Sequence, residues 1–371
     1  MRRKILHVVG SMSRGGVETW LMHVLRHIDR EKFQVDFLVH RKGDSSYDQE
    51  IRSLGAQIYC CADPRNLVEY AAKFSEIVRC HGPFHVVHSH VYWYSGYVLR
   101  LAHRAGVPIR IAHSHTATRP ARWNLPRRLY QNLMRSWILR HGTHRIGISW
   151  PAAEALFGRQ PAQPFTVLYY GLDFTRFKDV ESRDVVRRRL GIPPGRRIIG
   201  HVGRFVPVKN HAFMIDLLER VIAGGTDAHL MMIGDGPLLP AVRTKVEARG
   251  LSHRCTFAGE QSDVASFFSA MDVFVLPSHY EGLGIVALES QAAGVPLIAS
   301  TGVPAEVDVI SELVEHIPLS AGATGWASAV NRRLRQSKRR PGNEALLLEN
   351  SRFGLPKCLE ALSSVYLSGL N

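Results

Sequence analysis

Residues 279–289, His-Tyr-Glu-Gly-Leu-Gly-Ile-Val-Ala-Leu-Glu, decide how this chain is interpreted. They follow an apolar run, residues 273–276, that is typical of a buried strand. The glycines let the backbone approach a ligand closely, and residues 285–293 have helical periodicity. A helix that begins there directs unpaired N–H groups at the space above the strand, which suits a phosphate or sugar diphosphate. With Glu281 on the loop and Glu289 two turns into the helix, the pattern favours a sugar nucleotide over a bare anion.

The balance of charge predicts anionic partners. The chain has 47 Lys and Arg against 32 Asp and Glu, a formal net charge of +15. Such a surface attracts nucleic acid, acidic lipid or phosphorylated small molecules. Residues 119–145 interleave arginines with aromatic and aliphatic residues, as in a basic amphipathic helix that lies on an anionic bilayer. The same pattern also fits a surface helix whose aromatic side faces the core. A second basic run, 332–340, is interpreted as a solvated helix end, with a partner role as the alternative.

Length and cysteine content favour a protein of the cytoplasm. At 371 residues the chain is long enough for two domains, each with its own core. Its five cysteines have no metal-type spacing and require no disulfide, so a reducing compartment is the simplest location. No apolar run reaches the ~20 residues that a transmembrane helix needs, and the basic start leads into a predicted strand rather than a secretory signal. We expect a cytoplasmic protein, at most peripheral on the inner face of the membrane.

Short apolar strands alternate with amphipathic helices along the whole chain, which predicts an α/β fold with parallel sheets. The predicted strands are 5–9, 35–39, 57–60, 86–89, 110–113, 144–148 and 166–168, then 198–202, 229–233, 255–258, 273–276 and 296–299. The apolar pattern is interrupted near residues 170–194. We therefore predict two doubly wound Rossmann-like domains facing a cleft, 1–172 and 173–350, with a C-terminal helix in 351–371 that packs back on the first. In such sheets ligands bind beyond the carboxyl ends of the strands.

Loops at predicted strand ends supply candidate anion-binding groups. Gly15 and Gly16 follow the first strand, where backbone amides can face a phosphate, although a tight turn without a ligand fits equally. Arg204 and Lys209 follow strand 198–202 and offer a planar fork and a point charge. At ~4 Å and an effective dielectric of about 20, each cation–phosphate pair is worth on the order of 4 kcal/mol before desolvation. The alternative is an ordinary basic surface pair.

Two His-Ser-His triplets, 88–90 and 113–115, each end a predicted strand. Alternate strand residues share a face, so each pair could mimic metal ligands. No cysteine or carboxylate stands nearby with ligand spacing, and we predict no metal site. A histidine at the cleft edge that hydrogen-bonds a sugar hydroxyl is the preferred interpretation. For His88 and His113, a core histidine with a backbone partner is the alternative.

Together these residues resemble the retaining nucleotide-sugar glycosyltransferases of family 4, which have the GT-B fold. The resemblance covers nearly the whole chain and rests on Gly15-Gly16, the seam at 167–173, Gly203-Arg204 with Lys209, residues 234–237, and the two glutamates of Glu281-x7-Glu289. The first strand and its loop, with residues 111–116, are similar to the branch that builds bacterial capsular or exopolysaccharide repeat units. Two departures stand out: Tyr170-Gly171 replaces a common Asn-Gly, and the usual Asn-Gly turn after residues 300–306 is missing.

The resemblance implies a role for each matching residue. Glu281 would bind hydroxyls of the donor sugar, Glu289 the ribose, and His115 would lie near the reacting sugar, with His113 as the alternative. The implied catalytic residues are His115, Arg204, Lys209 and Glu281. The implied donor-binding residues are Gly15, Gly16, Gly203, Gly234, Gly282, Leu283, Gly284 and Glu289.

The resemblance also implies the reaction. A sugar would pass with retained configuration from a UDP- or GDP-sugar to a lipid-linked or growing-glycan acceptor, without a metal ion or other cofactor. A nucleotide-sugar 2-epimerase or a phosphorylase is the alternative within the same fold. A nucleic-acid-binding protein is the alternative from another class, although no recognisable nucleic-acid motif is present.

Overall fold

The computed structural model describes residues 2–41, 43–61, 63–116, 125–159, 164–336 and 342–368. The chain divides into two compact units, one formed by Met1–Leu172 with Arg352–Asn371 and the other by Asp173–Ser351. Each unit contains one sheet in which all strand pairs are parallel. The predicted α/β class with two parallel-sheet domains is confirmed.

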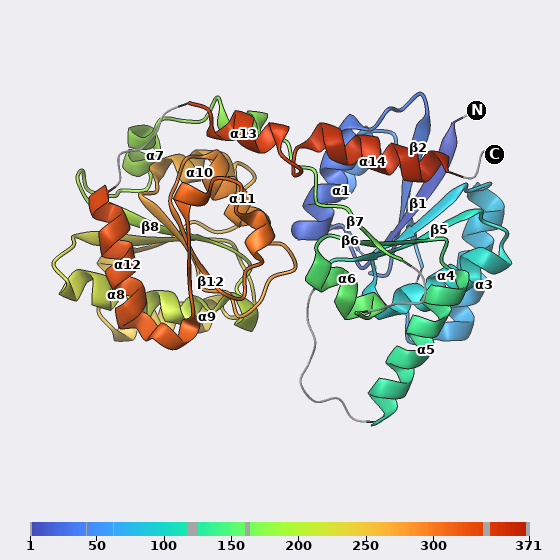
Figure 1. Cartoon of the computed structure of the whole chain (residues 1–371), viewed down its shortest axis with the longest axis horizontal. Coiled ribbons are helices and arrows are strands. Elements are labelled where there is room, and N and C mark those ends of the chain that lie inside the picture. The colour runs from blue at the N-terminus through green and yellow to red at the C-terminus, as the bar shows by residue number, and fades with distance from the viewer. Residues whose placement is uncertain are drawn as a thin grey trace. The chain divides into compact units, whose positions relative to one another are not determined.

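The first unit has a seven-stranded sheet in the order β3-β2-β1-β4-β5-β6-β7. Its strands are β1 (Arg3–Val9), β2 (Phe33–Val39), β3 (Ile58–Cys60), β4 (Val86–Ser89), β5 (Ile109–Ser114), β6 (His144–Gly147) and β7 (Thr166–Val167). Its helices are α1 (Gly16–His27), α2 (Asp48–Ser53), α3 (Leu67–His81), α4 (Ser95–Arg104), α5 (Leu125–His141), α6 (Trp150–Phe157) and α14 (Leu355–Leu367), with a short 3-10 helix η1 (Tyr92–Tyr94). Helices α1 and α14 cover one side of this sheet, while α3, α4 and α5 lie on the other (Figure 1).

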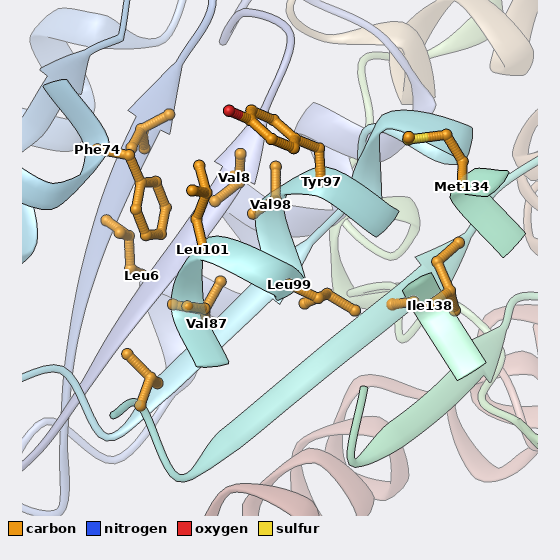
Figure 2. Packing of buried hydrophobic residues seen from close by; sticks show 14 of the residues in the cluster. Leu6, Val8, Phe74, Val87, Tyr97, Val98, Leu99, Leu101, Met134 and Ile138 are labelled. Atoms are coloured by element: carbon orange, nitrogen blue, oxygen red, sulfur yellow. The ribbon is translucent and has the colours of Figure 1, made fainter. Parts of the chain in front are cut away.

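Alternation along the strands decides which side each residue of this unit faces. Leu6 and Val8 of β1 belong to the apolar core against α3, α4 and α5, where Phe74, Val98 and Ile138 meet them (Figure 2). His7, between the two, faces the opposite side with α1 and α14. The C-terminal helix α14 is fixed there because the indole Nε1 of Trp20 on α1 donates to the Sγ of Cys358, 3.4 Å away.

The second unit has a six-stranded sheet in the order β10-β9-β8-β11-β12-β13. Its strands are β8 (Arg197–Val202), β9 (Ala228–Ile233), β10 (Cys255–Phe257), β11 (Val273–Leu276), β12 (Leu297–Ser300) and β13 (Val314–Ile317). Its helices are α7 (Arg183–Arg189), α8 (His211–Ala223), α9 (Leu239–Ala248), α10 (Val264–Ala270), α11 (Ile285–Ala292), α12 (Gly322–Gln336) and α13 (Glu344–Asn350), with 3-10 helices that include η2 (Thr175–Phe177) and η3 (Pro207–Lys209). Helices α8, α9 and α12 cover one side, and α10 and α11 the other (Figure 1).

An ion cluster fixes α7 to the second sheet. Asp272, which precedes β11 and is 3% exposed, accepts hydrogen bonds from the backbone N–H of Ile198 at 2.7 Å and from Arg187 at 2.6 Å. Arg183 also bonds this carboxylate at 2.5 Å. Desolvation by burial opposes the charge of Asp272, but these donors prevail and its pKa lies below the ordinary value. The segment that the sequence suggested as an irregular seam therefore contains an anchored helix.

Candidate active site

The two central strands of the second sheet, β8 and β11, lie at the point where the strand order reverses. In open α/β sheets such a switch point is where ligands bind, because the loops from the two strands diverge there. The loop after β8 and the loop after β11 are joined by a backbone hydrogen bond of 2.8 Å from His279 N to Val208 O. The loop after β12 joins them through a 3.0 Å bond from Glu281 N to Gly302 O. Three loops therefore form one edge.

This edge brings together two of the predicted catalytic side chains. The Nζ of Lys209, on η3, lies 2.6 Å from the Oε1 of Glu281. Their side chains are 18% and 11% exposed, so the pair is shielded from bulk water without being fully enclosed. Arg204 lies on the same β8 loop but is exposed, and among the described residues it forms no ion pair with a carboxylate. The edge thus combines one paired cation and one cation available to an external anion.

Close backbone packing explains the glycines at this edge. Gly234, which follows β9, has a φ of +130°, and an added Cβ would lie 2.2 Å from the carbonyl oxygen of Gly203. Gly203 in turn donates its N–H to Ile233 O at 2.9 Å. A side chain at Gly234 would therefore push apart the loops after β8 and β9. The glycine pattern that indicated ligand contact also has this structural cause.

Helix α11 begins beside the ion pair. Gly284 caps it with a φ of +88°, a left-handed conformation that favours glycine, and an added Cβ there would lie 3.7 Å from the Cγ of Glu281. Gly282 is half-buried and Leu283 is 2% exposed, so Leu283 can offer a ligand only its backbone. Glu289 is also buried, and its carboxylate forms an ion pair with Arg176 of η2. Arg176 was not among the predicted site residues, because it lies in the segment 170–194, where the apolar pattern is interrupted.

In the first unit, the predicted phosphate loop is open. Gly15 and Gly16 are exposed at the start of α1, and Gly15 is its N-cap residue. An added Cβ on Gly15 would lie 2.4 Å from the Oε2 of Glu18, one turn into the helix. A carboxylate close to these amides competes with any phosphate for them. This loop is therefore a weaker anion site than the edge that carries Lys209 and Arg204.

The histidine doublet of β5 is resolved by burial. His115 lies just beyond the end of the strand and is partly exposed, whereas His113 is fully buried. The Nδ1 of His115 lies 2.6 Å from the hydroxyl of Tyr170, and its Nε2 lies 2.8 Å from the Nδ1 of His90. Desolvation, with the charge of His7 as a lesser cause, lowers the pKa of His115 to about 3, so the ring is neutral at pH 7. Tyr170 stands where the family commonly has asparagine, and it has a specific partner here.

The expectation of backbone partners for the buried histidines is wrong. His88 and His113 are indeed core residues, but their partners are rings: the Nε2 of His88 meets the Nδ1 of His113 at 3.1 Å. The Nδ1 of His88 meets the hydroxyl of Tyr366 on α14 at 2.9 Å. The sequence pattern could not show this, because Tyr366 is far away in the chain.

Helix α5 contains the described part of the first basic run; residues 117–124, with Arg119 and Arg122, lie outside the described residues. Only Met134 and Ile138 of this helix are buried, while four large apolar residues are exposed: Leu125, Leu129, Tyr130 and Leu133. Arg135 is partly buried and donates from Nε to Leu156 O at 3.1 Å. The interpretation as a surface helix with an inward apolar side accounts for Met134 and Ile138 but not for the exposed residues.

The second basic run begins on α12, where Arg332 and Arg333 pair with Glu315, and its residues 337–340 lie outside the described part. Within the described ranges, no helix combines the length and apolar character needed to cross a membrane.

Comparison with known proteins identifies the family. Residues 15–171 match the model of the glycosyl transferase 4-like domain, and residues 182–341 match the model of glycosyl transferases group 1. The chain is 34% identical over 336 residues to EpsF of Bacillus subtilis, a protein named as a glycosyltransferase, covering 89% of this chain and 88% of EpsF. The chain belongs to the group 1 glycosyltransferases.

Two further similarities support this assignment, one over less of the chain and one at lower sequence identity. A lipopolysaccharide core biosynthesis mannosyltransferase, LpsB of Rhizobium meliloti, is 30% identical over 171 residues, which is 44% of this chain and 47% of LpsB. Among solved structures, HepE of Anabaena in complex with UDP and glucose has a TM-score of 0.81 at 16% identity, covering 98% of this chain and 99% of HepE. This similarity shows that this group 1 glycosyltransferase has the GT-B fold.

Proposed function

We propose that this enzyme transfers a sugar, with retained anomeric configuration and without a metal ion, from a nucleotide-diphosphate sugar to a lipid-linked or growing-glycan acceptor of a cell-surface polysaccharide. The Lys209–Glu281 pair beside exposed Arg204, at the switch point of the second sheet, is the observation that supports it most. A diphosphate leaving group needs cations where its negative charge develops. The loop after β8 supplies two.

The donor site that we propose follows the edge of the second sheet. Arg204 and Lys209 bind the diphosphate, with the Gly203 and Gly234 backbones beside them, and the first turn of α11 adds N–H groups. Glu281 binds hydroxyls of the sugar and also orients Lys209. Glu289 binds the ribose and is itself oriented by Arg176. Because solved HepE structures contain UDP, UDP and glucose, or UDP-glucose, we propose a UDP-sugar as the donor.

The ion pair of Glu281 bears on how a retaining transfer would proceed. A carboxylate held 2.6 Å from the Nζ of a lysine is engaged by that cation rather than by the anomeric carbon. We therefore propose that the acceptor hydroxyl attacks from the face that the diphosphate leaves, and that departing phosphate oxygens take its proton. His115, neutral at pH 7, lies near the reacting sugar and carries no charge into the reaction.

The acceptor is proposed from similarity and from α5. LpsB, named for lipopolysaccharide core biosynthesis, supports a role in making a surface glycan, for which we propose a lipid-linked acceptor. The exposed Leu125, Leu129 and Leu133, next to exposed Arg127 and Arg128, give α5 the apolar and cationic character of an interfacial helix. We propose that this helix holds the enzyme on the inner face of the cytoplasmic membrane.

A transfer assay tests the reaction. The enzyme is incubated with radiolabelled nucleotide sugars, one at a time, and with a lipid extract from membranes, in the presence and absence of EDTA. We expect label from a UDP-sugar to enter the lipid fraction equally in both conditions, with the anomeric configuration of the donor by NMR. Donor hydrolysis or epimerisation without transfer would refute the proposal.

Liposome co-sedimentation tests the membrane contact. Replacing Arg127 and Arg128 by serine should reduce binding to anionic vesicles, because each lysine or arginine near such a surface is worth about 1 kcal/mol. The matched control replaces Arg79 and Arg104, two exposed arginines on α3 and α4 of the same unit. Equal binding of both double variants would exclude α5 as the contact.

A further inference from the structure

Five histidines from three adjacent strands gather on the side of the first sheet that faces α1 and α14. They are His7 on β1, His88 and His90 on or just after β4, and His113 and His115 on or just after β5. Neighbouring rings lie close together: the ring centroids of His88 and His90 are 4.3 Å apart, and those of His113 and His115 are 4.2 Å apart. No carboxylate is part of this cluster in the described residues.

The hydrogen bonds of these rings form two separate chains. One runs from Tyr366 through His88 to His113, and the other from Tyr170 through His115 and His90 to His7. Each chain stops at a buried nitrogen with no partner, the Nε2 of His113 and the Nε2 of His7. A buried polar atom without a partner costs about 1–3 kcal/mol and calls for an explanation such as a bound ion.

We propose that His90, His113 and His115 bind a divalent transition-metal ion, with Zn²⁺ as the best fit. One nitrogen from each of these three rings can be chosen so that all three lie within 4.8 Å of one another. The free Nε2 of His113 is one ligand. The Nδ1 of His90 and the Nε2 of His115, which face each other at 2.8 Å, are the other two. The metal takes the place of the proton between them.

The remaining nitrogens of the three ligands already have partners, as metal-binding histidines require. With the metal bound in place of the hydrogen bond between His90 and His115, His115 would donate from Nδ1 to the Tyr170 hydroxyl, His90 from Nε2 to the Nδ1 of His7, and His113 from Nδ1 to the Nε2 of His88. One set of neutral tautomers satisfies all three bonds at once, because in each ring the other nitrogen then offers its lone pair to the metal. A second triad, His7, His88 and His90, is disfavoured because His88 would lose a partner outside the triad, Tyr366 or His113, whereas the first triad gives up only the bond between two of its own ligands.

Metal binding requires the ligand rings to move, and the site has a way in. Tetrahedral Zn²⁺ with Zn–N bonds of ~2.0–2.1 Å places its ligand nitrogens ~3.3 Å apart, so the rings of His90 and His115 must separate by about half an ångström. Both are partly exposed beyond the ends of their strands, whereas His113 is buried behind them. Three neutral imidazoles leave a fourth position for water or an anion. Imidazole-only ligands favour zinc, copper, nickel and cobalt over Mg²⁺.

The inference does not rest on the proposed transfer reaction, which we propose to need no metal. Bound zinc would occupy the Nε2 of His115, so this nitrogen could not contact a substrate.

Cobalt titration tests the site. Chain without a polyhistidine tag, freed of metal with a chelator, is titrated with Co²⁺, and the visible absorption of the cobalt is recorded before competition with Zn²⁺. We expect one equivalent of Co²⁺ with intense tetrahedral bands that Zn²⁺ removes, and a Zn²⁺-dependent rise in Tm. His90→Gln and His115→Gln, at partly exposed positions, should each weaken Zn²⁺ binding at least ~10-fold, and Tyr170→Phe should weaken it ~10–100-fold through loss of the outer partner.

The matched control is His103→Gln, which removes an exposed histidine of the same unit and should leave binding unchanged. Circular dichroism verifies that every variant is folded. Failure of the wild-type chain to bind one equivalent would overturn the proposal. Wild-type affinity in folded His90→Gln and His115→Gln variants would overturn it equally.

Discussion

Replacing Lys209 by methionine removes the cation proposed to bind the diphosphate while keeping an unbranched side chain that is one atom shorter. Two effects are expected. Glu281, whose side chain is 11% exposed, loses its lysine partner. This loss should lower the free energy of unfolding by about 1–3 kcal/mol. Loss of a cation ~4 Å from a diphosphate oxygen, at an effective dielectric of about 20, removes on the order of 4 kcal/mol of transition-state stabilisation. Since 1.36 kcal/mol is tenfold in rate, kcat/KM should fall about 10³-fold.

A second variant separates these effects. In Lys209→Met/Glu281→Gln both charges are gone, so no unpaired carboxylate remains and stability should return to within about 1 kcal/mol of the wild type. The transfer rate should stay low, because the cation is still missing. The control is Lys245→Met, which breaks a surface pair with Asp216 in the same unit, where the Nζ–Oδ1 distance is 2.7 Å. Surface pairs are worth about 0–1 kcal/mol, and this control should turn over normally.

Urea unfolding gives the stability of each variant, and release of the nucleotide diphosphate with varied donor gives kcat/KM. If activity recovers together with stability in the double variant, Lys209 is only structural and the proposed role is refuted. A single variant within about tenfold of the wild-type kcat/KM contradicts it as well.

Two substitutions and a pH titration test the packing of the second unit around the site. Asp272→Ala leaves the buried guanidinium of Arg187 without its carboxylate and should cost about 3–5 kcal/mol in urea unfolding, whereas Asp227→Ala, at an exposed pair, should cost less than about 1 kcal/mol. Gly234→Ala, with a φ of +130° and an added Cβ 2.2 Å from a carbonyl oxygen, should lower Tm and donor affinity; unchanged calorimetric values would disprove this reading of the loop packing. Burial lowers the pKa of His211 and His229 to about 4, so the unfolded state binds more protons between about pH 6.5 and 4, and stability falls as pH decreases through that range. Each should cost about 2 kcal/mol at pH 5 relative to pH 8 in urea melts, and a flat profile would argue against their burial as neutral rings.

The central strands and the site loops were predictable from the sequence. Strands buried on both faces often appear as continuous apolar runs, as residues 273–276 do. The bounds of this strand and of strand 86–89, which is apolar only in its first half, were predicted as observed. The loop residues Lys209 and Glu281 are 72 positions apart, yet both follow central strands, so topology alone predicts that they meet. Their ion pair is consistent with that expectation.

The less regular elements were not predictable. The sequence did not predict β13, α7 or α13, and of α12 it indicated only the end, through the basic run 332–340. Helix α7 contains four arginines in seven residues, and what holds it is a distant carboxylate, Asp272, rather than an apolar stripe. Partners so far apart in the chain leave no periodic signal. For the same reason, the sequence did not predict the ion pair between Arg176 and Glu289.

The histidines show that residue spacing within one strand is not enough to predict a metal site. Each His-Ser-His triplet alone offers two ligands and was dismissed as a metal site for lack of a third. The sheet order places β4 beside β5, and the third ligand that we propose comes from the neighbouring strand. Only the pairing of strands, which the sequence does not state, brings three rings within reach of one ion.

The central claim is that the loops after β8 and β11 bind the diphosphate of an activated sugar. Hydrogen–deuterium exchange with and without UDP tests it most directly, because it locates the binding residues without requiring the acceptor. We predict UDP-dependent protection of residues 203–210 and 279–286, and its loss in Lys209→Met. Protection confined to other segments, or equal protection of these loops in the Lys209→Met chain, would contradict the claim.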